Sequence, residues 1–274
     1  MSVRAAIVAA STRLADVSDT ARLDAELLMA HALGIERDRL LLDGDRLPIP
    51  DGFAAMVERR MAHEPVAYII GYRDFWTIRL AVGPGVLIPR PDSETLIEAA
   101  LAHFPERRAP LRILDLGTGP GTLLLAVLSE LPEAHGLGID ASDVALDYAR
   151  ANAASLGLDD RAVFRTGDWA TGLGGVFDLI LCNPPYVESD TMLDRQVADF
   201  EPAGALFAGP EGLDEYRRIL PMLPPLLTPD GLAVVEIGAG QRDAVSALAE
   251  LEGLRVKCRS DLAGRDRAIL CQQP

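Results

Sequence analysis

The chain has 274 residues, of which 49% are hydrophobic and 24% charged, a composition ordinary for a globular protein with one large domain or two unequal ones. Its formal net charge of −15 argues against broad, sequence-independent binding to nucleic acid, because such binding depends on Lys and Arg that neutralise phosphates. The apolar runs 5–10 and 123–128 are too short to span a bilayer, so we expect a soluble, cytoplasmic protein.

The cysteines Cys182, Cys258 and Cys271 lie in or beside apolar, strand-like runs. Their spacing is not that of metal ligands, so they are expected to be reduced, buried thiols. No metal site is predicted.

Residues 1–72 are predicted to form a small helical domain. The segment 21–33 has apolar residues at helical spacing, and Gly34 follows it as a suitable helix C-cap. A short turn of helix is expected over 38–42 and a longer helix over 51–63. Because no chemical motif occurs here, we expect this domain to dock a macromolecular partner or substrate.

Residues 73–90 are predicted to form a β-hairpin linker, with strands over 75–82 and 86–88 on either side of the turn 83–85. A helix should then run to about His103, capped by Asp92 or Ser93. The remaining residues, 91–274, are assigned to the catalytic domain.

From Leu111 the chain alternates strands and helices, which predicts an α/β domain with a mostly parallel sheet. The segment 136–140 has the weakest strand signal, because it contains Gly136 and Gly138 and glycine is depleted in strands. Residues 189–212 show no clear period and are expected to form a loop over the site. The candidate strands are 111–116, 136–140, 162–167, 177–182, 232–237, 254–259 and 267–271.

A glycine-rich turn, Gly117-Thr118-Gly119-Pro120-Gly121, follows the first of these strands and precedes a helix over 122–131. Glycines allow the backbone to approach a ligand closely, so this is the start of a nucleotide-binding unit. Its G-x-G-x-G spacing differs from the dinucleotide fingerprint G-x-G-x-x-G, which leans away from a dehydrogenase. Asp115 is expected to support the turn.

Acidic and aromatic residues end the next two strands. Asp140 lies about 20 residues after the glycines, where an acid hydrogen-bonds ribose hydroxyls in this architecture. Asp168 is placed to accept from an adenine amino group, and Trp169 to stack on the purine. With the glycine turn, these residues predict a cofactor site at the carboxyl edge of the sheet.

The tetrapeptide Asn183-Pro184-Pro185-Tyr186 ends the fourth strand, because two prolines cannot continue a central strand. The Asn183 side chain offers one carbonyl acceptor and one amide donor. The proline backbone adds carbonyl groups, and Tyr186 adds an aromatic face. This combination suits a planar group that carries an NH2, either a carboxamide or the amino edge of a purine.

These motifs together resemble class I S-adenosylmethionine-dependent methyltransferases that act on exocyclic or amide nitrogen. The segments 64–71, 75–76 and 87–94 are similar to the bacterial peptide chain release factor glutamine N5-methyltransferases, the HemK/PrmC family. Ser93 stands where that family usually has threonine, and Pro120 occupies a variable position. Further matches are Glu201-Pro202, Ala205-Leu206, Gly209, Gly212-Leu213-Asp214, Tyr216-Arg217, Glu236-Ile237-Gly238, Gln241, Asp261, Gly264, Asp266 and Arg267.

The resemblance implies a Rossmann-like, seven-stranded methyltransferase fold with helices on both faces, and S-adenosylmethionine as the methyl donor, converted to S-adenosylhomocysteine. It implies methylation of the glutamine in the Gly-Gly-Gln motif of class I release factors, which modulates translation termination. Neither membrane nor direct nucleic-acid contact is expected, and we expect a monomer. The cofactor residues are Gly117, Thr118, Gly119, Pro120, Gly121, Asp140, Asp168, Trp169 and Asn183; the substrate residues are Asn183, Pro184, Pro185, Tyr186, Ile88 and Pro89; the catalytic ones are Asn183, Pro184 and Tyr186.

A carboxamide nitrogen is a weak nucleophile, so the hypothetical mechanism is one of orientation. The Asn183 side-chain oxygen and the Pro184 carbonyl would accept the two N–H bonds and favour the positive charge that develops on nitrogen. Tyr186 would pack on the amide plane. No base is required, since the proton can leave after transfer.

Three other functions remain open at this point. The nearest is a nucleic-acid methyltransferase acting on adenine N6 or guanine N2, in which the same tetrapeptide would meet a flipped base. The second is a non-catalytic adaptor that binds the cofactor. Such an adaptor would not need the tetrapeptide. A dehydrogenase comes last.

Overall fold

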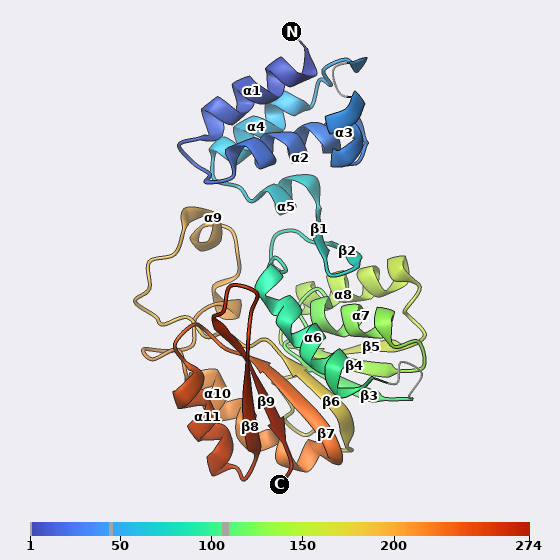
Figure 1. Cartoon of the computed structure of the whole chain (residues 1–274), viewed down its shortest axis with the longest axis vertical. Helices are drawn as coiled ribbons and strands as arrows, with labels where there is room; N and C mark the ends of the chain where they lie inside the picture. The colour runs from blue at the N-terminus through green and yellow to red at the C-terminus, as the bar shows by residue number, and fades with distance from the viewer. Residues whose placement is uncertain (1, 44–45, 106–109) are drawn as a thin grey trace. The chain divides into compact units, whose positions relative to one another are not determined.

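The structure is a computed structural model that describes residues 2–43, 46–105 and 110–274 (Figure 1). It contains two compact units. The smaller unit comprises the chain up to Tyr72 together with Leu193–Glu201, and the larger comprises Arg73–Met192 and Pro202–Pro274.

The smaller unit is helical. The prediction over 21–33 is confirmed, and Gly34 ends that helix in the left-handed region with φ 65°. The third helix agrees with the predicted 38–42, and the fourth is shorter than the predicted 51–63. The helices are α1 (Val3–Leu14), α2 (Ala21–Leu33), α3 (Arg37–Asp43), α4 (Phe53–Met61), α5 (Val66–Ile70) and α9 (Arg195–Ala198).

An apolar core holds α1 to α5, with Leu14, Leu28 and Met29 fully buried within it. Asp24 and Arg60 are also buried and form an ion pair of 2.8 Å. Burying one of these charges alone would be costly, so each compensates the other.

The hairpin lies earlier than predicted. Its strands are β1 (Tyr72–Phe75) and β2 (Ile78–Ala81), and the predicted strand over 75–82 is therefore interrupted. Trp76 turns the chain with φ 54°, because its backbone N–H donates to Glu94 and its indole to Glu130. The predicted strand over 86–88 is wrong, since those described residues are not in a strand.

The larger unit is built on a seven-stranded sheet of order β5-β4-β3-β6-β7-β9-β8, which confirms the α/β prediction. Neighbouring strands are parallel, except that β9 runs antiparallel to both β7 and β8. β7 begins five residues before the predicted 232. The strands are β3 (Arg112–Leu116), β4 (His135–Asp140), β5 (Ala162–Thr166), β6 (Phe177–Cys182), β7 (Leu227–Glu236), β8 (Arg255–Ser260) and β9 (Asp266–Gln272).

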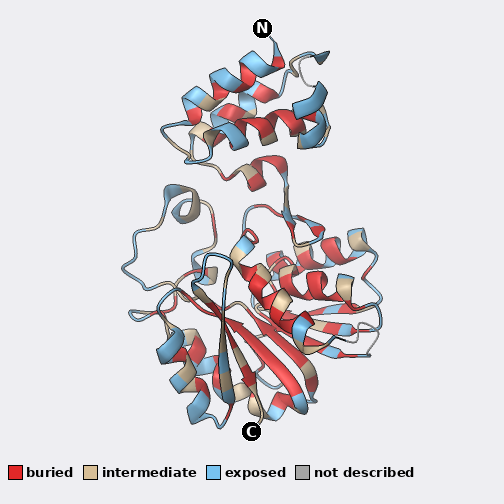
Figure 2. Cartoon of the chain, in the orientation of Figure 1, coloured by how far each residue is buried: buried red, intermediate tan, exposed pale blue. Residues whose placement is uncertain are grey.

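Alternate residues of the central strands face opposite sides of the sheet, and both sides are apolar. Ile113 and Leu179 pack into one core with α6 (Glu94–His103), α7 (Thr122–Glu130) and α8 (Asp143–Leu156). Leu114 and Ile180 pack into the other with α10 (Asp214–Ile219) and α11 (Arg242–Leu251). Figure 2 shows the resulting buried strands between helical layers.

The two glycines that weakened the prediction of β4 have a packing role. A side chain at Gly136 would meet Leu124 of α7 at 2.3 Å, and one at Gly138 would meet Phe164 of β5 at 2.6 Å. The missing side chains therefore leave room for α7 and β5 to pack against this strand.

Asn152 of α8 is buried and joins three parts of the larger unit. Its oxygen accepts from Ala81 N–H at 2.7 Å, and its nitrogen donates to the carbonyls of Ala81 at 3.1 Å and Pro120 at 2.9 Å. Asn152→Ala would leave these backbone groups unpaired. We expect it to lower the free energy of unfolding by about 3 kcal/mol, measured by urea denaturation.

Ser155→Ala is the matched control, because Ser155 is exposed on the same helix. It should leave the urea midpoint nearly unchanged. Equal midpoints for the two variants would show that the Asn152 hydrogen bonds do not contribute to stability.

Candidate active site

A cavity of about 430 Å³ opens at the carboxyl ends of β3, β4, β5 and β6. This is the edge at which open α/β sheets bind ligands. Ten of the residues predicted from the sequence line it: Pro89, Gly117, Thr118, Gly119, Pro120, Asp140, Asp168, Trp169, Asn183 and Pro185. Four others are not among the described lining residues: Ile88, Gly121, Pro184 and Tyr186.

The glycine turn links β3 to α7 and is held by the end of β4. The N–H groups of Gly117 and Thr118 donate to Ile139 O at 2.8 and 3.0 Å. Gly119 lines the cavity with φ 56°, and a side chain added there would meet nothing within 4 Å. Glycine is therefore favoured at this position by the backbone conformation, and its missing side chain leaves open space on the cavity side of the turn.

Asp115 supports the turn from below, as the sequence predicts. Its carboxylate accepts from the Thr118 hydroxyl at 2.7 Å and from Leu124 N–H at 3.3 Å. Burial raises the pKa of Asp115 to about 7, against those two hydrogen bonds, which lower it. Its second oxygen has no hydrogen-bond partner among the described residues.

Asp140 ends β4 and points into the cavity region with both oxygens oriented by backbone N–H groups. Oδ2 accepts from Gly119 N–H at 2.8 Å, and Oδ1 accepts from Ser142 N–H at 2.9 Å. Each carboxylate oxygen has a further lone pair, so this arrangement leaves acceptors for a diol.

The cavity rim contains an ion-pair cluster that the sequence did not predict. Both oxygens of Asp168 accept from Arg218, at 2.6 and 2.7 Å. The Trp169 indole donates to Glu215 at 2.7 Å, and Arg218 donates to the same oxygen at 2.8 Å. A group bound by Asp168 would therefore share this carboxylate with Arg218. Glu215 and Arg218 belong to α10, where the family resemblance matched Asp214, Tyr216 and Arg217 but not these two residues.

Trp169 also packs against the glycine turn. Its backbone adopts φ 50°, and a side chain at Gly117 would lie 3.0 Å from its ring. The indole thus lies beside the turn that the sequence assigns to the cofactor, on the same cavity wall.

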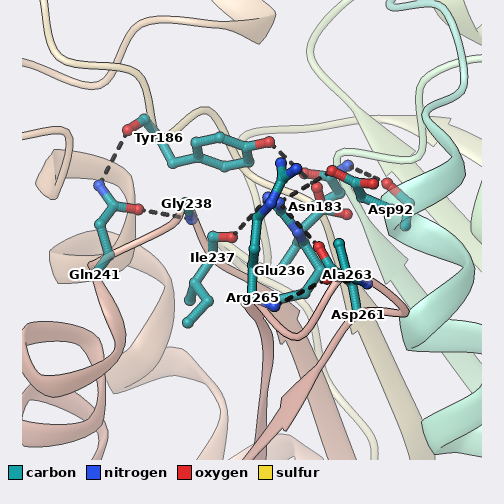
Figure 3. A network of polar contacts seen from close by, with 12 residues as sticks. Asp92, Asn183, Tyr186, Glu236, Ile237, Gly238, Gln241, Asp261, Ala263 and Arg265 are labelled. Carbon is teal, nitrogen blue, oxygen red and sulfur yellow. Dashed lines mark hydrogen bonds and ion pairs between the residues drawn. The ribbon is translucent and has the colours of Figure 1, made fainter.

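The tetrapeptide lies directly after β6, and each of its two polar side chains hydrogen-bonds a residue distant in the sequence (Figure 3). Asn183 Nδ2 donates to Ser93 Oγ at 3.2 Å. The Tyr186 hydroxyl donates to Glu236 Oε1 at 3.3 Å, and Gln241 Nε2 donates to Tyr186 O at 3.1 Å. Burial raises the pKa of Tyr186 well above its ordinary value, so its hydroxyl stays protonated.

The segment after the tetrapeptide is a loop, as predicted, apart from the short helix α9 and a turn of 3-10 helix at Ala203–Ala205. Val187 pairs with Phe207 as an isolated bridge. The later part of the loop contributes Pro202, Gly204 and Ala205 to the cavity lining. No described helix is long and apolar enough to cross a membrane.

Comparison with known proteins agrees with the resemblance stated from the sequence. Residues 5–71 match the PrmC N-terminal domain, and residues 108–207 match a methyltransferase domain. A methyltransferase from Pyrococcus furiosus superposes with a TM-score of 0.54 over 71% of this chain and 89% of that chain. At 17% identity, this likeness shows the fold alone.

Curated relatives match over nearly the full length. The release factor glutamine methyltransferase of Rhodospirillum rubrum is 45% identical over 258 residues, which cover 92% of this chain and 79% of that protein. That of Caulobacter vibrioides is 44% identical over 270 residues, covering 96% and 93%. The methyltransferase domain and fold imply S-adenosylmethionine as the methyl donor. The chain belongs to the release factor glutamine methyltransferase family.

Proposed function

We propose that this chain methylates the side-chain nitrogen N5 of the glutamine in the Gly-Gly-Gln motif of class I peptide chain release factors. One observation supports this most directly: Asn183, the glycine turn and Asp140 line the same cavity. An amide-binding group and the cofactor elements therefore open into one space. The relatives' shared name supplies the release factor and its glutamine.

The cavity residues fit S-adenosylmethionine. Gly119 leaves space beside the turn, Asp140 presents two oriented oxygens for ribose hydroxyls, and Trp169 offers an aromatic face. When bound, the cofactor supplies an electrophilic methyl group on a sulfonium. We assign its binding to Gly117, Thr118, Gly119, Pro120, Asp140, Asp168, Trp169 and Asn183, with Gly121 shaping the turn.

The chain's own contribution is to orient a weak nucleophile. Asn183 Oδ1 and the Pro184 carbonyl would accept the two N–H bonds of the glutamine amide and stabilise positive charge on its nitrogen. Pro185 and Pro89 line the cavity, whereas Ile88 is buried beside it. Tyr186 is not among the described lining residues. Its ring would pack on the plane of the glutamine amide, and its hydrogen bond to Glu236 holds it in place.

Asp140→Ala tests the cofactor assignment. A hydrogen bond to a charged acceptor contributes about 1.5–3 kcal/mol, so losing the ribose contacts should raise the dissociation constant of S-adenosylmethionine by about 10- to 100-fold. Isothermal titration calorimetry measures this directly.

Asp143→Ala is the matched control, because it removes the same charge three residues later. Asp143 is exposed, accepts from the Thr166 hydroxyl at 2.6 Å and does not line the cavity among the described residues. Its variant should bind the cofactor like the wild type. Equal affinities for both variants and the wild type would remove Asp140 from the ribose role.

The reaction is tested by offering labelled S-adenosylmethionine with a release factor, its isolated Gly-Gly-Gln loop peptide, DNA and RNA. We expect mass spectrometry to locate the methyl group on the glutamine nitrogen of the release factor. Label confined to adenine or guanine would contradict this proposal and favour the nucleic-acid methyltransferase. Cofactor binding with no transfer to any of the four would favour the adaptor.

Residues 1–72 are proposed to dock the release factor, with 73–90 as linker and 91–274 as the catalytic domain. The match of residues 5–71 to the PrmC N-terminal domain supports a separate role for this segment. If docking contributes, the loop peptide should show a much higher KM than the intact release factor at similar kcat.

We further propose a monomer acting in the cytoplasm, where release factors work; light scattering tests the monomer.

A further inference from the structure

A buried hydrogen-bond chain lies behind Asn183 and reaches the end of β7 (Figure 3). Asn183 Nδ2 donates to the Ser93 hydroxyl, and Ser93 in turn hydrogen-bonds the Glu236 carboxylate. Ser93 is 2% exposed and Glu236 is 0% exposed. Water therefore has little access to these groups, and their hydrogen bonds are made within the protein, except that Glu236 Oε2 has no hydrogen-bond partner among the described residues.

The direction of this chain follows from its last member. An ionised carboxylate can only accept hydrogen bonds, so Ser93 must donate its single O–H to Glu236. Ser93 then has only lone pairs to offer to Asn183, which must present its NH2 group. Of the two orientations of the Asn183 amide, this selects the one with Nδ2 toward Ser93.

The selected orientation is the one that the reaction needs. With Nδ2 held by Ser93, Oδ1 lies on the opposite side of the planar amide, and no hydrogen bond to it is found among the described residues. A carbonyl oxygen is what an N–H donor of the substrate requires. The flipped amide would present NH2 to NH2, which repels the glutamine side chain.

Glu236 also holds the second polar side chain of the tetrapeptide. The Tyr186 hydroxyl donates to Oε1 at 3.3 Å. The positive charge of Arg267 compensates the buried carboxylate, and Arg267 itself pairs with Asp92 at 3.0 Å. One carboxylate therefore fixes both Asn183 and Tyr186.

We propose that Ser93 and Glu236 are positioning residues that hold Asn183 with its side-chain oxygen toward the substrate amide. The inference rests on the proposed function, which makes that oxygen the acceptor. Ser93 also lines the cavity, whereas Glu236 is not among the described lining residues, but neither needs to touch the substrate, because each acts through the next member of the chain. A threonine at 93 would serve equally, since it has the same hydroxyl.

The chain contains only two asparagines, Asn152 and Asn183, which makes the hydrogen bond directly observable. In protein labelled with isotope only in asparagine side chains, NMR should show two NH2 pairs. Ser93→Ala should shift the Asn183 pair and leave the Asn152 pair in place, because Asn152 bonds Ala81 and Pro120 instead. An unmoved Asn183 pair would overturn the proposal.

Kinetics on an intact release factor provide the second readout. Ser93→Ala should lower kcat about tenfold, with KM and the cofactor dissociation constant near their wild-type values, because only the orientation of the acceptor is lost. Ser93→Thr should restore most of kcat. Ser129→Ala is the matched control, since the Ser129 hydroxyl bonds Ala126 O at 2.7 Å on α7 and Ser129 is not among the described cavity-lining residues.

The pH dependence of kcat distinguishes positioning by a charge from simple packing. Burial raises the pKa of Glu236 to about 7, although the Ser93 hydrogen bond and Arg267 lower it. Protonated Glu236 can donate to Ser93 and so no longer selects one orientation. Wild-type kcat at saturating cofactor should therefore rise between about pH 6 and about pH 8, and Glu236→Gln should reduce this rise to the part contributed by Asp115, whose pKa is also about 7.

The groups facing Glu236 support this attribution. Arg267 and Asp92 face it as charges, while burial raises the pKa values of Cys182, Tyr186 and Tyr216 and keeps them neutral. An unchanged rise in Glu236→Gln would overturn the proposal. So would an active wild type with an equally active Ser93→Ala variant. A wild type inactive on every release factor would instead contradict the proposed function, and the inference with it.

Discussion

Replacing Asn183 with alanine is expected to lower kcat for release factor methylation by about 100- to 1,000-fold. Removing one preorganised hydrogen-bonding group from an active site typically costs that much. The cost is large here because the carboxamide nitrogen is a weak nucleophile that depends on orientation. Steady-state kinetics at saturating cofactor measure it.

Cofactor binding should largely survive the same change. Asn183 is one of eight residues assigned to the cofactor, and the cavity keeps the glycine turn and Asp140, so the dissociation constant of S-adenosylmethionine should change by less than about threefold, corresponding to less than about 0.7 kcal/mol. Calorimetry on the same variant provides this control. Full activity in Asn183→Ala would contradict the assigned role, and loss of cofactor binding would show that Asn183 mainly holds the cofactor.

The residues that were predictable from the sequence are those that end strands. Gly117 follows β3, Asp140 is the last residue of β4, and two prolines after Asn183 stop β6. In a parallel sheet such strand ends meet at one edge, so local signals far apart in the chain predict a common site. The cavity lining confirms that these residues lie together.

The supporting network was not predictable in the same way. Ser93 and Asn183 are 90 residues apart, and a single serine or glutamate has no local pattern. In the sequence, Glu236 has no local feature that distinguishes its role from that of other acids at strand ends. Its role follows only from the pairing of β7 with β6 in the sheet. Such contacts depend on sheet order and register, which local periodicity does not encode.

The misplaced hairpin has a related cause. The run 75–82 has the composition of one strand, but Trp76 takes a turn conformation there because Glu94 and Glu130 accept its two N–H groups. Those acceptors lie on α6 and α7. Tertiary hydrogen bonds thus override the local β propensity.

Replacing Arg267 with methionine is expected to lower the free energy of unfolding by about 1.5 kcal/mol near pH 8, because Glu236 takes up a proton when its partner is removed, which limits the loss to about 1.4 kcal/mol per pH unit above its wild-type pKa of about 7. Arg267 is 5% exposed, and the Glu236 carboxylate that it compensates is 0% exposed. Methionine keeps most of the side-chain volume, so the loss reports the charge and not a cavity. Urea denaturation at several pH values measures it.

The pH dependence identifies Glu236 as the origin of the loss. Its folded-state pKa of about 7 lies above the ordinary value of 4.5, so its contribution to stability is full at low pH and declines as pH rises through 7. Without Arg267 that pKa should rise further and the decline should extend to higher pH. The difference from wild type should therefore be small near about pH 5 and should grow steadily as pH rises above about 7.

A second substitution separates charge from packing. In Glu236→Gln with Arg267→Met the buried charges of Glu236 and Arg267 are both removed, while Asp92 stays about half exposed and Asp261, whose side chain is 5% exposed, keeps its hydrogen bonds from Ala263 and Arg265 N–H. The double variant should recover most of the stability near pH 8 but not the activity. Glu236→Gln removes the carboxylate that makes the Ser93 hydroxyl donate to position 236 and accept from Asn183. A loss that is equal at all pH values, and not recovered in the double variant, would assign the effect to the packing of Arg267 and its bond to Ile237 O.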